Sequence, residues 1–223
     1  MSTDAALRVL VVDDHDLFRT GLRALLEEAG GMEVADAPDG EAALSMLQRF
    51  MPDVVVMDIN MPGMSGIEAT RRVRDAQPGA SVLMLTINRD ETRVVDAVRA
   101  GASGYVLKGA ELDQIVAAIR AAASGQPVLD PAAAGAVMAH VRDSPSETPS
   151  TAVADLSKRE REVLVLIARG CDNAAIGERL FMSASTVKHH VSSILQKLGV
   201  ENRLQAAAIA IRDGVADGGG EAR

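Results

Sequence analysis

Polar residues follow four short apolar runs in the first half of the chain, and their types suit phosphoryl or metal chemistry. Asp58 ends one run, Asp13 and Asp14 follow an earlier one, Thr86 ends a third, and Lys108 follows a fourth. α/β proteins bind ligands at the carboxyl ends of their parallel strands. We therefore expect these side chains to form one acidic site that carries a lysine.

Adjacent carboxylates at strand ends can serve three kinds of chemistry. They can bind a hard cation such as Mg²⁺, share a proton in acid–base work, or attack phosphorus and form an aspartyl phosphate. Mg²⁺ favours the third, with Lys108 pairing with the phosphoryl group and the Thr86 hydroxyl donating a hydrogen bond to it. A plainer interpretation is that Asp13 and Asp14 only cap the next helix. Asp, Thr and Lys at three further strand ends favour the chemical interpretation.

Short apolar runs alternate with amphipathic helical patterns over the first 125 residues. The pattern predicts strands at 8–12, 33–37, 54–58, 81–86 and 104–107, and helices at about 15–29, 40–50, 65–77, 91–101 and 111–124. Such alternation produces βαβ units and a parallel sheet that is covered on both faces. The sequence therefore predicts an α/β domain over residues 1–126, with a flavodoxin-like, doubly wound (βα)5 fold.

The pattern changes after residue 126. We predict a linker over 127–155, with a short Ala-rich helix at 131–142 and a polar, Pro-bearing stretch after it. An all-α domain is expected over 156–213 and a disordered tail over 214–223. The helices of the all-α domain are predicted at about 158–169, 173–180, 184–198 and 202–213, with Gly170 and Gly199 as C-caps and Ser183 as an N-cap.

Composition and charge restrict the class of protein. The chain has 223 residues, is 48% hydrophobic and has no Trp, one Tyr and three Phe, so its core must be aliphatic. We find neither a signal peptide nor an apolar stretch of about 20 residues, and we expect a cytoplasmic protein with no membrane association. The net charge is −8, yet residues 156–212 hold nine Lys and Arg against five Asp and Glu. This excess indicates a nucleic-acid surface in the C-terminal part.

The C-terminal helices form a helix-turn-helix pattern. Two short helices, a turn near 181–183 and a longer amphipathic helix fit this motif, whose second helix enters the major groove. Lys188 and His189 lie early in that helix and can donate hydrogen bonds to bases. Thr186, Lys188 and Lys197 can meet phosphates. The alternative is a generic helical bundle with solvated Lys and His side chains.

Four motifs in the first 125 residues match those of a known family. They are VVDDH at 11–15, VMDINMPGMSG at 56–66, LT at 85–86 and GASGYVLK at 101–108. On these motifs, residues 7–125 resemble a response-regulator receiver domain of the kind found in CheY. The resemblance implies that Asp58 accepts a phosphoryl group from a sensor histidine kinase.

The resemblance also implies roles for the neighbouring residues. Asp14, Asp58 and the backbone carbonyl of Asn60 would bind Mg²⁺, with Asp13 helping through water. Thr86 and Tyr105 would form a switch pair, in which the hydroxyl moves toward the phosphoryl group and the ring rotates inward. The main rival is a Mg²⁺-dependent phosphohydrolase. Such enzymes usually carry a second Asp as general acid two residues after the nucleophile, where this chain has Asn60, so we do not expect an enzyme.

Residues 156–211 resemble a LuxR-type helix-turn-helix domain. The motifs are LSKREREVL at 156–164, IARGCDN at 167–173, AAIGERLFMS at 174–183 and TVKHHV at 186–191. The whole chain is similar to a NarL/FixJ-type response regulator. This resemblance implies that the helix near 184–198 reads double-stranded promoter DNA, with Ser192 among its contacts.

The last helix is expected to form the homodimer interface. Its apolar face consists of Leu204, Ala207, Ala208 and Ile211. In the predicted mechanism the receiver masks the recognition helix until Asp58 is phosphorylated, and the released domains then dimerise on paired half-sites. A phosphorylation-independent regulator is a third possibility, which the intact Asp, Thr and Lys set argues against.

Overall fold

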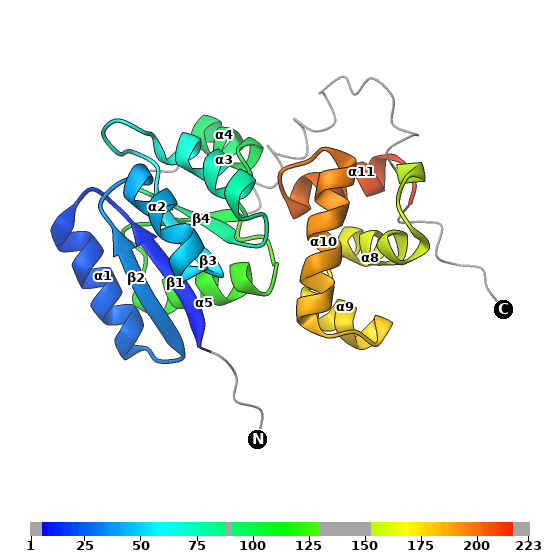
Figure 1. Cartoon of the computed structure of the whole chain (residues 1–223), viewed down its shortest axis with the longest axis horizontal. Coiled ribbons are helices and arrows are strands. Elements are labelled where there is room, and N and C mark those ends of the chain that lie inside the picture. The colour runs from blue at the N-terminus through cyan, green and yellow to red at the C-terminus, as the bar shows by residue number, and fades with distance from the viewer. Residues whose placement is uncertain (1–5, 88–90, 130–152, 216–223) are drawn as a thin grey trace.

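The computed structural model describes residues 6–87, 91–129 and 153–215, with only the backbone at 91 and 92. The described residues form two units that lie side by side along the long axis of the molecule, one built on a sheet and one all-helical (Figure 1). The predicted helix at 131–142 lies outside the described residues. So do most of the stretch 143–155 and most of the tail 214–223.

The first unit is a five-stranded parallel sheet with strand order β2-β1-β3-β4-β5. The strands are β1 (Leu7–Val12), β2 (Met32–Ala37), β3 (Val54–Asp58), β4 (Ser81–Thr86) and β5 (Gly104–Leu107). The helices between and after them are α1 (Asp16–Glu28), α2 (Gly40–Phe50), α3 (Gly66–Ala76), α4 (Glu91–Arg99) and α5 (Leu112–Ala123). This confirms the predicted doubly wound fold.

Helices cover both faces of the sheet, which explains why its strands read as continuous apolar runs. One apolar cluster joins the sheet to α2, α3 and α4 through Leu47, Val73 and Ala97. A second cluster, on the other face, joins it to α1 and α5 through Leu26 and Ile119. Every residue of the central strand β3 is buried. The functional edge at the end of β3 is therefore held on a rigid element.

The second unit contains α8 (Lys158–Ala168), α9 (Asn173–Leu180), α10 (Ala184–Leu198) and α11 (Arg203–Arg212). Each begins at a polar residue whose side chain accepts a backbone N–H three positions on: Ser157, Asp172, Ser183 and Asn202. Gly199 is the left-handed C-cap of α10, as predicted. The C-cap of α8 is instead Arg169, and the predicted cap Gly170 is the next residue, with φ +77°. No helix of the described residues has the length and apolarity needed to cross a bilayer.

The sheet unit continues past residue 126. Val128 forms a parallel bridge with Gly104, accepting from the Tyr105 amide at 2.9 Å and donating to the Ser103 carbonyl at 3.1 Å. A Cβ at position 104 would lie 2.3 Å from the Val128 oxygen, so only glycine permits this approach. Backbone pairing therefore carries the receiver-like unit to Val128, two residues beyond the predicted boundary.

Candidate functional site: an acidic pocket and a helical DNA surface

Asp58 ends β3 and is only 1% exposed. The chain turns immediately after it, and Ser65 caps α3 by accepting the Glu68 amide. Gly66, the first residue of α3, lies so close to this turn that a Cβ would sit 1.8 Å from the Asp58 carbonyl oxygen. Gly66 therefore allows α3 to start directly against the Asp58 backbone. The sequence interpretation gave it no role; its place in the turn after Asp58 was the available signal.

Lys108 lies between two carboxylates. Its Nζ is 2.9 Å from Asp58 Oδ2 and 2.6 Å from Asp13 Oδ2, and it stands 5.0 Å from the centre of the Phe18 ring. Burial lowers the pKa of Lys108, but the bonds to the two carboxylates outweigh it and raise the pKa above its usual value. Lys108 is therefore a fixed cation beside Asp58, where the sequence placed it.

The Asp58 carboxylate has too few hydrogen-bond donors to offset the cost of its burial. Burial raises its pKa, Lys108 lowers it and the neighbouring Asp13 charge raises it, so that the pKa lies above the usual range for Asp. Asp58 Oδ1 is buried and has no hydrogen-bond partner among the described residues. Burying an acceptor without a donor costs free energy, so a ligand that supplies positive charge would bind favourably at this oxygen.

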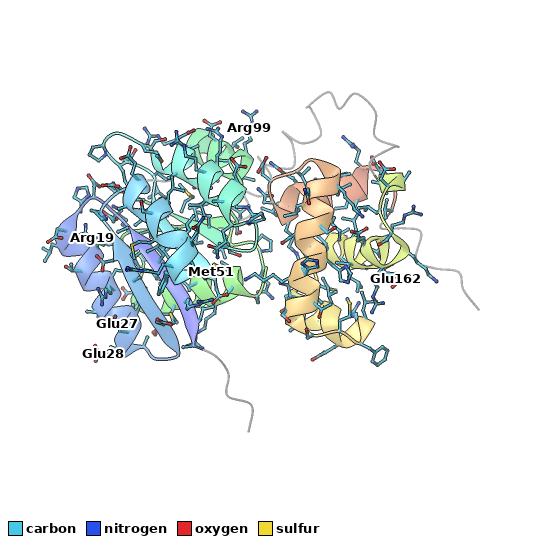
Figure 2. All side chains as sticks on the ribbon, viewed as in Figure 1. Arg19, Glu27, Glu28, Met51, Arg99 and Glu162 are labelled. Atoms are coloured by element: carbon cyan, nitrogen blue, oxygen red, sulfur yellow. The ribbon has the colours of Figure 1, made fainter. Side chains whose placement is uncertain are left out.

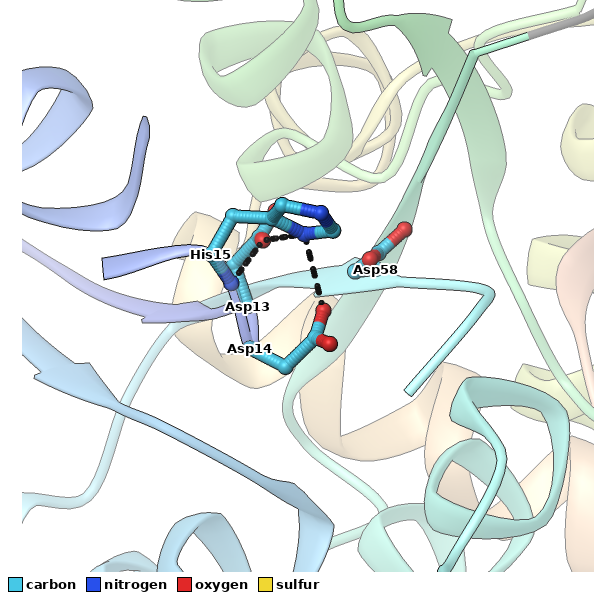
Figure 3. A group of neighbouring side chains, drawn as sticks. All are labelled: Asp13, Asp14, His15 and Asp58. Carbon is cyan, nitrogen blue, oxygen red and sulfur yellow. Dashed lines mark hydrogen bonds and ion pairs between the residues drawn. The ribbon is translucent and has the colours of Figure 1, made fainter. Parts of the chain in front are cut away.

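The acidic side chains converge on one point (Figure 3). Ligand atoms of Asp13, Asp14, His15 and Asp58 all lie within 4.8 Å of one another. The His15 amide donates to Asp13 Oδ1 at 2.9 Å, and its ring Nδ1 lies 3.0 Å from Asp14 Oδ1. Three carboxylates, one of them with the unpartnered Asp58 oxygen, form the oxygen-rich donor set that a hard divalent cation prefers. The residues present therefore fit Mg²⁺; the sequence interpretation did not place His15 in this cluster.

Three further predicted site residues lie at the end of β4, on β5 and in the loop after β3. Thr86 is buried at the end of β4, and its carbonyl accepts the Lys108 amide at 2.8 Å. Tyr105 is half-buried on β5 and packs against the apolar cluster under α2, α3 and α4. Asn60 lies in the loop after Asp58, where its side-chain oxygen accepts a bond from Arg93 at the start of α4. A pocket next to the acidic cluster is lined by Asn60, Arg93 and Asp14, among others.

Four of the five residues predicted to contact DNA divide into two groups. Thr186 and His189 on α10 are exposed. Lys188 Nζ lies 3.5 Å from Asp53 Oδ1 of the sheet unit. Ser192 lines a cavity of about 60 Å³ between the two units. In Figure 1, α10 is one of the helices of the second unit that lie next to the sheet unit. Part of the predicted DNA surface therefore faces the receiver-like unit.

Lys197, the remaining predicted phosphate contact, pairs with a buried carboxylate. Its Nζ is 2.7 Å from Glu160 Oε2, and Ser193 donates to Glu160 Oε1 at 2.7 Å. Glu160 also accepts the Ser157 amide in a capping box. Burial raises the Glu160 pKa, but Lys197, Ser193 and Ser157 outweigh burial and lower the pKa to about 2. Glu160 thus has a structural, charge-pairing role.

The predicted dimer face is largely covered in this arrangement. Leu204 lines the cavity between the units, Ala208 is buried, Ala207 packs on the helical core, and Ile211 is exposed. Hydrogen bonds tie the units together beside it. Asn202 Nδ2 donates to the Val98 carbonyl at 2.5 Å, and Arg74 Nη2 donates to the Glu201 carbonyl at 3.1 Å.

Comparison with known proteins finds a matching family for each half of the chain. Residues 9–120 match the response regulator receiver domain, and residues 154–210 match the luxR family of bacterial regulatory proteins. The chain is 41% identical over 213 residues to the transcriptional regulatory protein LiaR of Bacillus subtilis (strain 168), covering 93% of this chain and 98% of that protein. It is 35% identical over 208 residues to the nitrate/nitrite response regulator protein NarL of Escherichia coli (strain K12), covering 93% and 96%.

A solved structure is similar over almost the whole chain. The crystal structure of the response regulator ChrA in a heme-sensing two-component system is 38% identical, with a TM-score of 0.50, covering 95% of this chain and 99% of that one. The domain matches, the relatives and the observed fold agree with one another. The chain belongs to the two-component response regulators that join a receiver domain to a LuxR-type DNA-binding domain and regulate transcription.

Proposed function

We propose that this transcription regulator is switched by phosphorylation of Asp58. The donor is the phosphohistidine of a sensor kinase. An Asp58 carboxylate oxygen attacks phosphorus, the O–P bond forms as the N–P bond breaks, and the histidine nitrogen takes up a proton. The observation that carries this proposal is the buried Asp58 carboxylate, which has Lys108 at 2.9 Å and one oxygen without a partner.

The surrounding residues stabilise the product. Lys108 pairs with the phosphoryl oxygens, and the Thr86 hydroxyl donates to them. Asp13, Asp14, Asp58 and the Asn60 carbonyl would hold Mg²⁺, which when bound neutralises phosphoryl charge. Asn60 has no carboxyl proton to give or take, so rapid hydrolysis of the acyl phosphate lacks a general acid–base group at this position. The phosphorylated form then lasts long enough to act as a signal.

Masking of the DNA surface is the resting state in this proposal. We assign the receiver to residues 1–126 and the linker to 127–155, whose first residues pair with β5 through Val128. The DNA-binding domain is assigned to 156–213 and a tail to 214–223. The Lys188–Asp53 pair and the Asn202–Val98 hydrogen bond hold α10 and α11 against the receiver. Lys188, Ser192 and Leu204 are then unavailable to DNA or to a second copy of the chain.

Phosphorylation opens this arrangement. A phosphoryl group adds about −1.5 to −2 charges beside Thr86 and biases the receiver toward a second conformation in which Tyr105 turns inward. Val98, which accepts the bond from Asn202, lies in α4, an element that such a change reaches. The freed domains dimerise through Leu204, Ala207, Ala208 and Ile211. Thr186, Lys188, His189, Ser192 and Lys197 then contact two DNA half-sites.

The test combines phosphoryl labelling with DNA binding. Full-length protein is incubated with radiolabelled acetyl phosphate and Mg²⁺, and its affinity is measured for duplexes selected from a random pool by the beryllofluoride-treated protein. We expect labelling of the native chain and of Asp113→Asn, a control in the exposed first turn of α5, but not of Asp58→Asn. Labelling should raise both DNA affinity and the dimer fraction seen by light scattering. Labelled Asp58→Asn, or labelling without a change in DNA affinity, would contradict the proposal.

A further inference from the structure

Arg19 is a buried charged residue that the proposed phosphoryl chemistry leaves without a role. It lies on α1 (Figure 2) and is only 8% exposed. Removing a guanidinium from water costs several kcal/mol unless its donors are well paired. The contacts of Arg19 therefore indicate what its burial achieves.

Arg19 bonds to three separate parts of the receiver. Its Nη1 donates to the Asp13 carbonyl oxygen at 2.9 Å, and its Nε donates to Asp36 Oδ2 on β2 at 2.9 Å. Its Nη2 pairs with Asp16 in the first turn of α1. The guanidinium is planar and rigid, so two bonds to carboxylates fix the direction of the third. That third bond ends on the backbone between the two acidic residues.

The Asp13 carbonyl belongs to the peptide bond that joins Asp13 to Asp14. A peptide unit is planar and contains the Cα atoms of both residues, so holding its oxygen fixes the plane from which both side chains project. The Asp13 amide is held as well, by the Ala37 carbonyl at 3.2 Å. The carboxylates of Asp13 and Asp14 are thereby directed toward Asp58, within the 4.8 Å cluster.

Arg23 provides a comparison within the same helix. It is one turn further along α1, and its side chain is 45% exposed. Arg23 Nη1 donates to the other Asp36 oxygen at 2.8 Å, and its Nε donates to Glu27 at 3.0 Å. Both arginines contribute to the lowered pKa of Asp36, which they achieve against the effect of burial. They share Asp36, but the bond to the Asp13 carbonyl comes from Arg19.

We infer that Arg19 is a positioning residue for the divalent-cation site: it orients the Asp13–Asp14 peptide so that both carboxylates face Asp58. This inference rests on the proposed function, because it assumes that the acidic cluster holds a divalent cation. Substitution of a residue that orients metal ligands typically lowers metal affinity about 10- to 100-fold. We therefore expect Arg19→Gln to weaken cation binding about 10-fold or more.

The experiment uses Mn²⁺ as the probe, with free Mn²⁺ followed by electron paramagnetic resonance in titrations of the full chain. Arg19→Gln and Arg19→Lys should both bind Mn²⁺ more weakly, because lysine restores the charge but not the fork. Arg23→Gln should stay within about twofold of the native chain, because its bonds go to Asp36 and Glu27. At saturating Mn²⁺, labelling of Arg19→Lys by acetyl phosphate should return close to the native rate.

Several results would overturn the inference. Native Mn²⁺ affinity in a folded Arg19→Gln or Arg19→Lys chain would show that the bond to Asp13 is unimportant. An equal loss in Arg23→Gln would assign the effect to Asp36 instead. If Arg19→Gln does not fold, as judged by circular dichroism, Arg19→Lys decides the question. Failure of the native chain to bind Mn²⁺ or to be labelled would instead refute the proposed function, and so separates the two.

Discussion

The two units each bury a carboxylate next to a lysine, yet they treat it in opposite ways. In the receiver, Asp58 shares Lys108 with Asp13, keeps one oxygen without a partner, and has a raised pKa. In the DNA-binding domain, Glu160 receives bonds from Lys197, Ser193 and the Ser157 amide, and its pKa falls to about 2. Both residues are almost fully buried. The two carboxylates therefore differ in their partners, and burial raises the pKa of both.

This contrast separates a site that holds structure from a site that holds chemistry. Glu160 is surrounded by donors, so its ionised form stabilises the fold. Asp58 faces a second carboxylate and has no donor at its Oδ1, so its ionised form costs free energy until a cation or a phosphoryl group arrives. The receiver thus gives up local stability to keep its site receptive.

Substitution of Glu160 is expected to have the largest effect. Glu160→Gln leaves Lys197, Ser193 and the Ser157 amide without their ionised acceptor. The free energy of unfolding of the DNA-binding domain should fall by about 2–3 kcal/mol at pH 7. Calorimetry of the full chain, with hydrogen exchange across α8–α11, measures this loss. Glu162→Gln is the control, since Glu162 pairs with Arg159 at the surface and should cost less than about 0.5 kcal/mol. Equal losses in both variants would contradict the special role of Glu160.

Acid should remove the same contribution from the native chain. Folding lowers the Glu160 pKa from 4.5 to about 2, so the stability that it contributes is fully present above pH 4.5 and is lost as the pH falls toward 2. We expect the helical domain to lose about 2 kcal/mol between pH 5 and pH 3. Hydrogen exchange of α8 and α10 measured over this range should show the loss in the native chain and a smaller one in Glu160→Gln. A flat pH profile in the native chain would count against this assignment.

Asp58→Asn should change stability in the opposite direction. Because the Asp58 pKa is raised in the folded chain, folding takes up protons and the free energy of unfolding falls as the pH rises above the ordinary Asp value of 3.8. Removing the charge should therefore stabilise the cation-free receiver at pH 7 by about 1–2 kcal/mol. Thermal melting in a chelating buffer tests this. Asp113→Asn, which removes an acidic residue from the first turn of α5, should instead be neutral or slightly destabilising.

The contact between the two units should give the smallest effect. Asp53 lies on the receiver side of the pair with Lys188, and both side chains are about one third exposed. Such a pair contributes at most about 1 kcal/mol. Asp53→Asn should therefore raise the DNA affinity of the unphosphorylated chain only about twofold, without altering the DNA surface itself. Fluorescence anisotropy on a selected duplex measures this change; a decrease in affinity would show that Asp53 does not help to mask α10.

Local patterns predicted the elements and much of the acidic site. Strand and helix positions followed from the alternation of apolar runs with a helical period, because buried strands and amphipathic helices differ in that period. Ser183 was predicted as a cap because a hydroxyl at that position can accept the Thr186 amide, as it does. Asp13, Asp58 and Lys108 could be placed together because parallel strands end at one edge of the sheet.

Contacts between distant side chains could not be predicted in the same way. Lys188 and Lys197 both looked like solvated cations available to phosphates, and the sequence did not reveal that one pairs with Asp53 and the other with Glu160. The sequence interpretation gave Arg19 no role. Its burial depends on Asp36, which comes from the next strand. Such pairings depend on how the elements pack against one another, and local periodicity does not reveal that packing.

The bridge between Val128 and Gly104 has a mechanical consequence. The chain leaves the receiver from the edge of β5, held there by bonds on both sides of Gly104, one of them from the amide of Tyr105. The linker to the DNA-binding domain is thus anchored on β5, the strand that carries Tyr105, the expected switch residue. A shift of β5 would move the point and the direction in which the linker leaves the receiver. The effective concentration of one domain near the other would change with it, before any contact in the interface is broken.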